Sequence, residues 1–295
     1  MTGLGAVFRP QLPPERLRAV VQLADATGLE ELWLWEDCFR EGGISAAAAA
    51  LAWSGQVRVG VGLLPVPLRN VAITAMEVAT LHRLFPGRAI LGVGHGVQDW
   101  MGQVGARVES PVTLLREHLD ALRALLRGER LTTNGRYVKL DDVALDWPPT
   151  GPVEILAGAT GPRTLRLAGA AAVGTILTAS TAPDGVRRAR QLIDEGRESA
   201  GRTEPHKVVV YLLTATATAT ATGPDAAARL RAELAEEGLE SVPDLGVAGD
   251  ADTVAKAVQR LAEAGADTVI LQPTGDEPDP EAFVRFAAEV RALVP

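Results

Sequence analysis

The sequence predicts a (β/α)8 barrel of the TIM-barrel class, and three observations lead to that fold. Short runs rich in Leu or β-branched residues alternate with amphipathic stretches, which indicates parallel strands joined by crossover helices. Eight such runs occur, and this number fits a closed barrel better than an open doubly wound sheet. The 295 residues suit one barrel of about 250 residues or more, and they also suit two domains of about 150 residues each.

The expected strands are short and apolar, and the segments between most of them are long enough to hold a helix. They span residues 3–8, 32–35, 57–64, 89–93, 153–157, 172–177, 207–214 and 267–271. The expected helices span residues 13–27, 44–53, 72–84, 111–126, 183–200, 224–237, 250–264 and 281–293, and a further helix begins within 163–168.

Signals at the helix ends support these boundaries. In the first helix, Pro13 and Pro14 mark the start, apolar residues recur at i, i+3, i+4 and i+7, and Gly28 marks the end. Near the other end of the chain, Asp250 or Asp252 is expected to cap the helix over 250–264.

Two stretches interrupt the alternation of strands and helices. Residues 128–151 contain Asn134-Gly135, a type I′ hairpin signal, between short β-like runs. We therefore expect a single barrel domain over residues 1–295 with an inserted excursion on the rim at about 128–151. Residues 215–222 alternate Thr and Ala, and we interpret them as a strand extension or a loop.

Composition excludes several function classes. One cysteine, Cys38, rules out a disulfide framework and a Cys-based zinc site. The net charge is −8 without a Lys/Arg run, no apolar stretch reaches the roughly 18 residues of a membrane span, and the start MTGLGAVFRP has no basic segment before an apolar one. We expect a soluble cytoplasmic protein that binds neither nucleic acid nor membrane.

We interpret His82, His118 and His206 as structural or loop residues, and the scattered histidines argue against a metal-dependent hydrolase.

Ligands of a barrel lie at the carboxyl ends of its strands, so the turns that follow the strands carry the candidate chemistry. Glu36 and Asp37 follow the second strand, where carboxylates are costly unless they meet hydrogen-bond donors. They indicate ligand binding and acid–base work, or alternatively a solvated turn or a helix cap. After the third strand, Gly62 and Pro65 favour close approach of the backbone to a flat ligand, or simply a strand that ends at proline.

The next two turns have the composition of anion sites. Gly94 and Gly96 flank His95 and leave backbone N–H groups free, so His95 is a candidate ligand contact as well as a candidate structural residue. The turn over 158–164 leads into a helix and carries Arg163, which is typical of a phosphate cradle and also of a turn with an exposed arginine.

Segments from these turns resemble a known family. LWLWED at 32–37, RN at 69–70, PGR at 86–88, GVGHG at 92–96 and GATGP at 158–162 resemble the bacterial luciferase-like flavin oxidoreductases, in particular the branch that uses the deazaflavin coenzyme F420. The resemblance covers nearly the whole chain. It implies a luciferase-like barrel with rim insertions and an enzyme that transfers hydride between F420 and a small organic substrate.

The resemblance also implies roles for individual residues. It places a non-prolyl cis peptide at Gly62–Leu63 against the cofactor ring, and it makes Asp37, Glu36 and His95 the expected catalytic residues, although many relatives have His where this chain has Asp37. The implied cofactor contacts are Glu36, Gly62, Leu63, Leu64, Pro65, His95, Gly96, Val97, Gly158, Thr160, Gly161, Arg163 and Thr164. The expected substrate contacts are Trp35, Trp100 and Met101, and segments 98–110 and 134–147 are expected to form a lid.

Alternatives remain at this point. In the sugar-phosphate dehydrogenases of the family a Glu base falls near Val97, so the apolar residue argues against that reaction. FMN is the alternative cofactor, in a monooxygenase supplied with reduced flavin by a partner reductase. A flavin-binding barrel without catalysis is the third reading. Relatives are commonly dimers that pack their second and third helices together, so we expect a homodimer.

Overall fold

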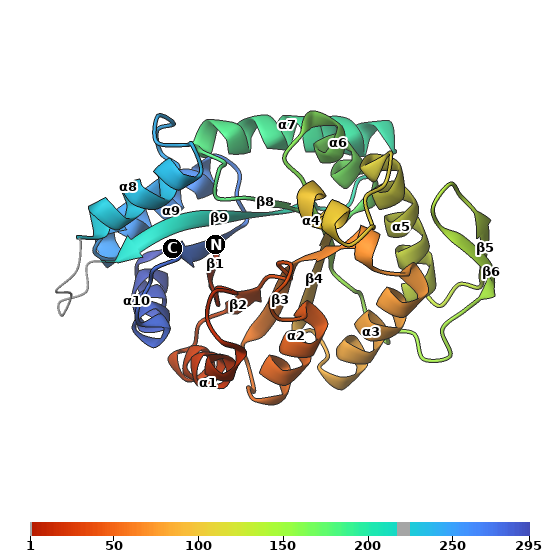
Figure 1. Cartoon of the computed structure of the whole chain (residues 1–295), viewed down its shortest axis with the longest axis horizontal. Helices are drawn as coiled ribbons and strands as arrows, with labels where there is room; N and C mark the ends of the chain where they lie inside the picture. The colour runs from red at the N-terminus through yellow and green to blue at the C-terminus, as the bar shows by residue number, and fades with distance from the viewer. Residues whose placement is uncertain (1, 217–224) are drawn as a thin grey trace.

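The computed structural model describes residues 2–216 and 225–295 and contains the predicted barrel (Figure 1). The eight barrel strands are β1 (Gly3–Val7), β2 (Glu31–Leu34), β3 (Arg58–Pro65), β4 (Ala89–Gly94), β7 (Ile155–Gly158), β8 (Gly174–Leu177), β9 (Lys207–Thr216) and β11 (Thr268–Pro273). All are parallel, and the order β9-β11-β1-β2-β3-β4-β7-β8 closes because β8 pairs with β9. Each strand overlaps one expected from the sequence, so the predicted fold class is confirmed.

The helices agree with the prediction except at some ends. They are η1 (Pro14–Arg16), α1 (Leu17–Thr27), α2 (Gly43–Ala52), η2 (Val66–Leu68), α3 (Val71–Leu84), α4 (Gln98–Gln103), α5 (Pro111–Leu126), α6 (Pro162–Ala171), α7 (Pro183–Ser199), α8 (Ala226–Glu236), α9 (Ala251–Glu263) and α10 (Pro280–Leu293). The first expected helix divides into a 3-10 turn and α1, and Asp250 caps α9 by accepting a hydrogen bond from the backbone N–H of Thr253. The prediction missed α4 and a short strand, β10 (Gly246–Gly249), which pairs only with β9.

Two hydrophobic layers hold the barrel together. The smaller layer fills its interior and comprises Val7, Trp33, Ile90, Leu156, Ile176, Val209, Tyr211 and Ile270. The larger one lies between the strands and the surrounding helices. Trp33 fits inside only because Gly60 of the neighbouring strand has no side chain, since a Cβ there would lie 2.4 Å from the Trp33 ring.

The rim excursion contains an antiparallel hairpin, β5 (Leu131–Asn134) and β6 (Lys139–Val143), beside α5 (Figure 1). The predicted type I′ turn is wrong, because neither Asn134 nor Gly135 has a positive φ angle. Glu117 of α5 sets the turn instead: its carboxylate accepts hydrogen bonds from three successive backbone N–H groups, those of residues 136–138, at 2.8–2.9 Å.

The Thr/Ala alternation is only partly described. Ala215 and Thr216 complete β9, as the strand-extension interpretation expects, while residues 217–222 lie outside the described residues. Pro224, where the seventh helix was expected to begin, also lies outside them, and α8 is capped by Asp225. Among the described residues, no helix has the length and apolar character needed to cross a membrane.

Candidate active site

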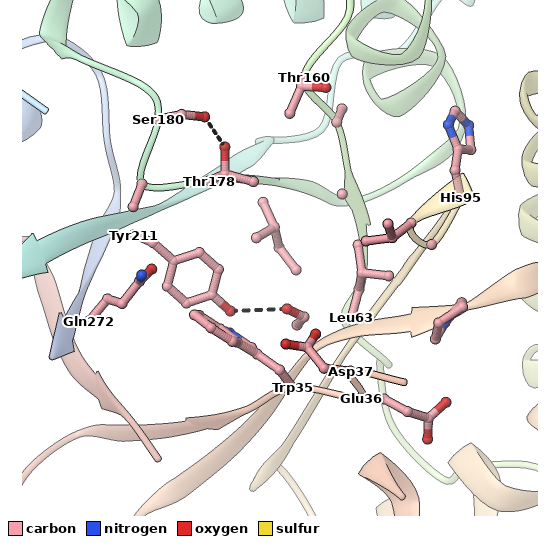
Figure 2. A pocket seen from close by; sticks show the side chains of 18 of the residues that line it. Trp35, Glu36, Asp37, Leu63, His95, Thr160, Thr178, Ser180, Tyr211 and Gln272 are labelled. Atoms are coloured by element: carbon pink, nitrogen blue, oxygen red, sulfur yellow. Dashed lines mark hydrogen bonds between the residues drawn. The ribbon is translucent and has the colours of Figure 1, made fainter. Parts of the chain in front are cut away.

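A cavity of about 710 Å³ lies where the carboxyl ends of the barrel strands meet (Figure 2). Thirteen of the residues expected at the site line it: Trp35, Glu36, Asp37, Gly62, Leu63, Pro65, His95, Gly96, Val97, Trp100, Gly158, Thr160 and Thr164. The structure thus brings together four turns that are distant in the sequence. The chemical roles of these residues stay predictions.

A bulge in β3 forms the centre of the cavity wall. The peptide bond Gly62–Leu63 is cis, as expected from the resemblance, and the pairing of β3 with β4 shifts register at this point. The Leu63 side chain lies over Gly94 and Gly158, where an added Cβ would come within 2.5 Å and 2.1 Å of a Leu63 methyl carbon. These glycines therefore make room for an apolar platform that faces the cavity.

Aromatic rings form the floor below this platform. Tyr211 of β9 meets Trp33 and Trp35 edge to face, with ring centroids 6.0 Å and 5.4 Å apart. Its hydroxyl donates a hydrogen bond of 3.4 Å to the carbonyl oxygen of Gly62, and burial raises the pKa of Tyr211, so the phenol keeps its proton. The guanidinium of Arg9 lies 5.3 Å from the centroid of the Trp35 ring.

Both carboxylate oxygens of Glu36 are bound by other residues of the protein. Its Oε2 accepts a hydrogen bond from the N–H of Gly43 at the start of α2, at 2.7 Å, and the Arg69 guanidinium pairs with both of its carboxylate oxygens. Arg69 also pairs with Glu77 of α3 at 2.9 Å. We call Glu36, Arg69 and Glu77 the Arg69 cluster; it ties the turn after β2 to the turn after β3.

Asp37 differs from its neighbour. Its carboxylate points toward Trp35 and Tyr211, whereas that of Glu36 points away from the cavity (Figure 2). Burial raises the pKa of Asp37, and the positive charges of Arg40 and Arg9 counteract part of that rise. A carboxyl group with a raised pKa is suited to exchanging a proton with a bound molecule. A second cis peptide, Cys38–Phe39, follows it in the same turn and was not predicted.

His95 borders the cavity just after β4, and its Nε2 is buried without a hydrogen-bond partner among the residues that the structure describes. Burial lowers the pKa of His95, so the ring is neutral at physiological pH and can donate or accept one hydrogen bond to a ligand.

Hydroxyl groups line the opposite side. Thr178 and Ser180, in the turn after β8, share a hydrogen bond of 2.7 Å, and Thr160 lies in the turn before α6 (Figure 2). With the N-terminus of α6, capped by Gly161, this region offers donors suited to an anion.

Four expected site residues do not line the cavity. Leu64 is fully buried and faces α2, because alternate residues of a strand point to opposite sides and Leu63 already faces inward. Met101 is fully buried beneath Gly96 in the unpredicted helix α4. Gly161 lies at the cap of α6, and the exposed Arg163 two residues further on is also outside the lining. Of the two expected lid segments, 98–110 contributes Trp100 to the lining, whereas no residue of 134–147 borders the cavity.

The prediction missed several lining residues, most of which lie in the barrel strands or in the loops next to them. They are Arg9, Gln11, Ala159, Ile176, Thr178, Ala179, Ser180, Tyr211, Glu237 and Gln272. Tyr211 and Gln272 occupy inward-facing positions of their strands, where their polar groups stand out among apolar residues and could have been found by examining every such position.

Comparisons with known proteins agree with this geometry. A family model described as luciferase-like monooxygenase matches residues 3–268. A 5,10-methylenetetrahydromethanopterin reductase of Methanolobus tindarius is 32% identical over 207 residues, 70% of this chain and 62% of the relative. An F420-dependent glucose-6-phosphate dehydrogenase of Kineococcus radiotolerans is 29% identical over 323 aligned positions, covering 96% of this chain and 94% of the relative. The chain thus matches less than two thirds of the length of the first relative.

Solved structures extend the likeness to the whole fold. An F420-dependent secondary alcohol dehydrogenase, in complex with an F420-acetone adduct, superposes with a TM-score of 0.86 at 21% identity, covering 100% of this chain and 99% of that one. A coenzyme F420 dependent tetrahydromethanopterin reductase from Methanopyrus kandleri gives a TM-score of 0.81 at 22% identity with the same coverage. At these identities the likeness concerns the fold alone.

Proposed function

The chain belongs to the luciferase-like monooxygenase family, and on that premise we propose that it is an oxidoreductase that uses coenzyme F420 to exchange hydride with a small organic substrate. The observation that carries this proposal is the Leu63 platform, which is made possible by Gly94 and Gly158. A flat ring needs an apolar face with no side chains in the way, and the cavity volume of about 710 Å³ lies within the usual range for cofactor sites. The names of the Kineococcus relative and of the superposed alcohol dehydrogenase both state F420 dependence.

The residues on the cavity wall fit such a cofactor. When bound, a deazaflavin supplies a carbon that donates or accepts hydride. The Leu63 platform would seat its ring, His95 Nε2 would meet a polar ring atom, and the hydroxyls of Thr160, Thr178 and Ser180 would hold the polar side chain together with the N-terminus of α6.

We propose Asp37 as the group that carries the proton. A carbonyl that receives hydride also needs a proton on its oxygen, and the protonated Asp37 carboxyl would donate it; in the reverse direction the carboxylate would take it up. Glu36 would act as a positioning residue, because both of its oxygens are already bound by Arg69 and Gly43.

The charges suit an uncharged, weakly polar substrate. Arg9 is the one cationic side chain among the described lining residues, and its guanidinium is bound by Glu233 at 3.0 Å and by the carbonyl oxygen of Pro273 at 3.1 Å. A phosphate ester would therefore meet no unpaired cation there.

The test is a titration of purified protein with F420 and, separately, with FMN, followed by fluorescence. We expect F420 to bind with sub-millimolar affinity and FMN more weakly. The variant Gly158→Ala places a Cβ against Leu63 and should weaken F420 binding by about tenfold or more. Gly151→Ala is the control, because an added Cβ there meets nothing within 4 Å and the residue lies outside the cavity lining; it should bind F420 as the wild type does.

Tight FMN binding without F420 binding would refute the cofactor assignment, and oxygen consumption with reduced FMN would then indicate a monooxygenase. Binding of F420 without turnover of any ketone, imine or alcohol in a broad panel would indicate a binding protein instead.

We also propose that the protein is a homodimer. Ile73, Met76 and Leu84 lie on one face of α3 and are 50%, 55% and 66% exposed. An apolar stripe of this kind on a helix marks an interaction surface. Sedimentation at micromolar concentration should give twice the chain mass of 31.0 kDa, and Met76→Glu should give the monomer. A wild-type protein that sediments as a monomer would exclude the dimer.

A further inference from the structure

A second cavity, of about 460 Å³, lies between η2, the N-terminal half of α5 and the start of β6. It shares no lining residue with the candidate active site. Its walls combine apolar residues, among them Val66, Leu114 and Leu140, with polar ones, and its volume falls within the range of about 300–1,000 Å³ that is usual for small-molecule sites.

A buried polar atom without a partner borders this cavity. His118 of α5 is 1% exposed, and its Nε2 makes no hydrogen bond among the described residues. Burial and the positive charge of Arg69 lower the pKa of His118 to about 4, so the ring is neutral near pH 7. An unpaired buried nitrogen is destabilising, and a ligand in the cavity that forms a hydrogen bond with it would remove that cost.

The charged side chains around the cavity are cationic. Arg69 and Lys139 line it, and no carboxylate occurs among the described residues of its lining. Arg69 is paired with Glu36 and Glu77, whereas exposed Lys139 has no ion pair within the described part of the chain. An anionic group at this site would therefore find an available ammonium group as well as the imidazole.

We propose that this cavity is a second binding site, for a small amphipathic carboxylate. The apolar body of the ligand packs against Val66, Leu114 and Leu140, and its carboxylate accepts hydrogen bonds from Lys139 and from the Nε2–H tautomer of His118.

The site is coupled to the candidate active site through Arg69. The side chain of Arg69 borders the second cavity, and its guanidinium holds Glu36, the residue next to Asp37. A carboxylate that attracts Arg69 weakens its hold on Glu36 and so changes the turn after β2. Because coupling of this kind is reciprocal, the ligand changes cofactor affinity and the cofactor changes ligand affinity by the same factor.

Isothermal titration of the whole protein with octanoate, without cofactor, tests the site. We expect saturable binding to one site, and octan-1-ol should bind about tenfold more weakly because it lacks the charge. Lys139→Gln should lower the octanoate affinity by about tenfold, and Leu140→Trp should abolish binding by filling the cavity. Lys256→Gln is the matched control, since this lysine lies on α9 and pairs with Asp252; it should bind as the wild type does.

Absence of saturable binding to the wild type at millimolar octanoate would overturn the proposal. Wild-type affinity in Lys139→Gln, an exposed position that does not threaten folding, would overturn it as well, because the ligand would then be bound elsewhere. The coupling rests on the proposed function and is measured separately: saturating octanoate should change the F420 dissociation constant severalfold, and an unchanged constant refutes the coupling while leaving both binding results intact.

Discussion

The two sides of the candidate active site are built in different ways. The first wall comprises the turn after β2 (residues 35–37), the bulged end of β3 (residues 62–65) and the segment after β4 (residues 95–100). The second wall comprises Ile176 of β8, Tyr211 of β9 and Gln272 of β11 with the turn at 178–180. In the first wall the backbone is irregular: it has a cis peptide at Gly62–Leu63 and a register shift in β3. The second wall continues regular parallel pairing up to Leu177 and Pro273.

The walls also differ in charge. The first carries Glu36, Asp37 and His95, and the shifted pKa values of Asp37 and His95 trace to burial. The second presents neutral donors and acceptors such as Thr178 and Gln272 within the described residues, with Glu237 at its edge. We infer that acid–base chemistry belongs to the first wall and that hydrogen bonding to a bound molecule belongs to the second.

The largest expected effect comes from Asp37→Asn, which keeps the shape of the side chain and removes its ability to carry a proton. We expect turnover to fall by about 10²–10⁴-fold with F420 affinity retained. In the wild type, reduction of a carbonyl should slow as the pH rises through the raised pKa of Asp37, and in the variant this dependence should disappear. The measurement is the change in F420 absorbance as a function of pH, with a small ketone from the panel above.

The free energy of unfolding of the same variant provides an independent test of the raised pKa. Because burial raises the pKa of Asp37, the folded state favours the neutral carboxyl, and its contribution to stability is lost as the pH rises through the raised pKa. The free energy of unfolding near pH 7 should therefore be equal or higher in Asp37→Asn. Glu41→Gln is the control: Glu41 is in the same loop, also has a pKa raised by burial, and lies outside the cavity lining. Turnover that drops equally in both variants would contradict the role of Asp37.

The first wall was also the more predictable one from sequence. Glycines, prolines and paired carboxylates mark its turns, so the residue types that follow the predicted strands are enough to suggest Glu36, Gly62 and His95 as site residues. The cis peptide required the resemblance to a family, because no local pattern distinguishes Gly62–Leu63 from an ordinary strand end. The barrel itself followed from the alternation of apolar runs with amphipathic stretches, since consecutive parallel strands must be joined by crossovers.

The second wall escaped prediction for a physical reason. Tyr211 and Gln272 lie in apolar strands, β9 and β11, that pair with each other in the sheet. Whether such a residue reaches the cavity depends on the tilt of the strands in the closed barrel and not on local sequence. The partners of Glu36 were equally hard to predict, because Arg69 reaches it from the loop after β3 and Gly43 from the start of α2, seven residues along the chain. Residue type predicts a catalytic carboxylate, whereas these contacts support our proposal of a positioning role.

A smaller effect, on stability, should distinguish the ion pairs of the first wall from an ion pair behind the second wall. In Glu36→Gln the side chain keeps its size but loses its charge, which leaves Arg69, a half-buried cation, with Glu77 as its remaining ion partner. We expect the free energy of unfolding to fall by about 1–3 kcal/mol in urea titrations, and F420 to bind more weakly because the turns after β2 and β3 are no longer held together. Glu195→Gln is the matched control behind the second wall, where the Arg166–Glu195 pair joins α6 to α7 in solvent and its loss should cost less than about 1 kcal/mol. If the two variants lost equal stability and kept equal F420 affinity, the Arg69 cluster would be an ordinary surface ion pair, and the difference between the two walls would lie in their backbones alone.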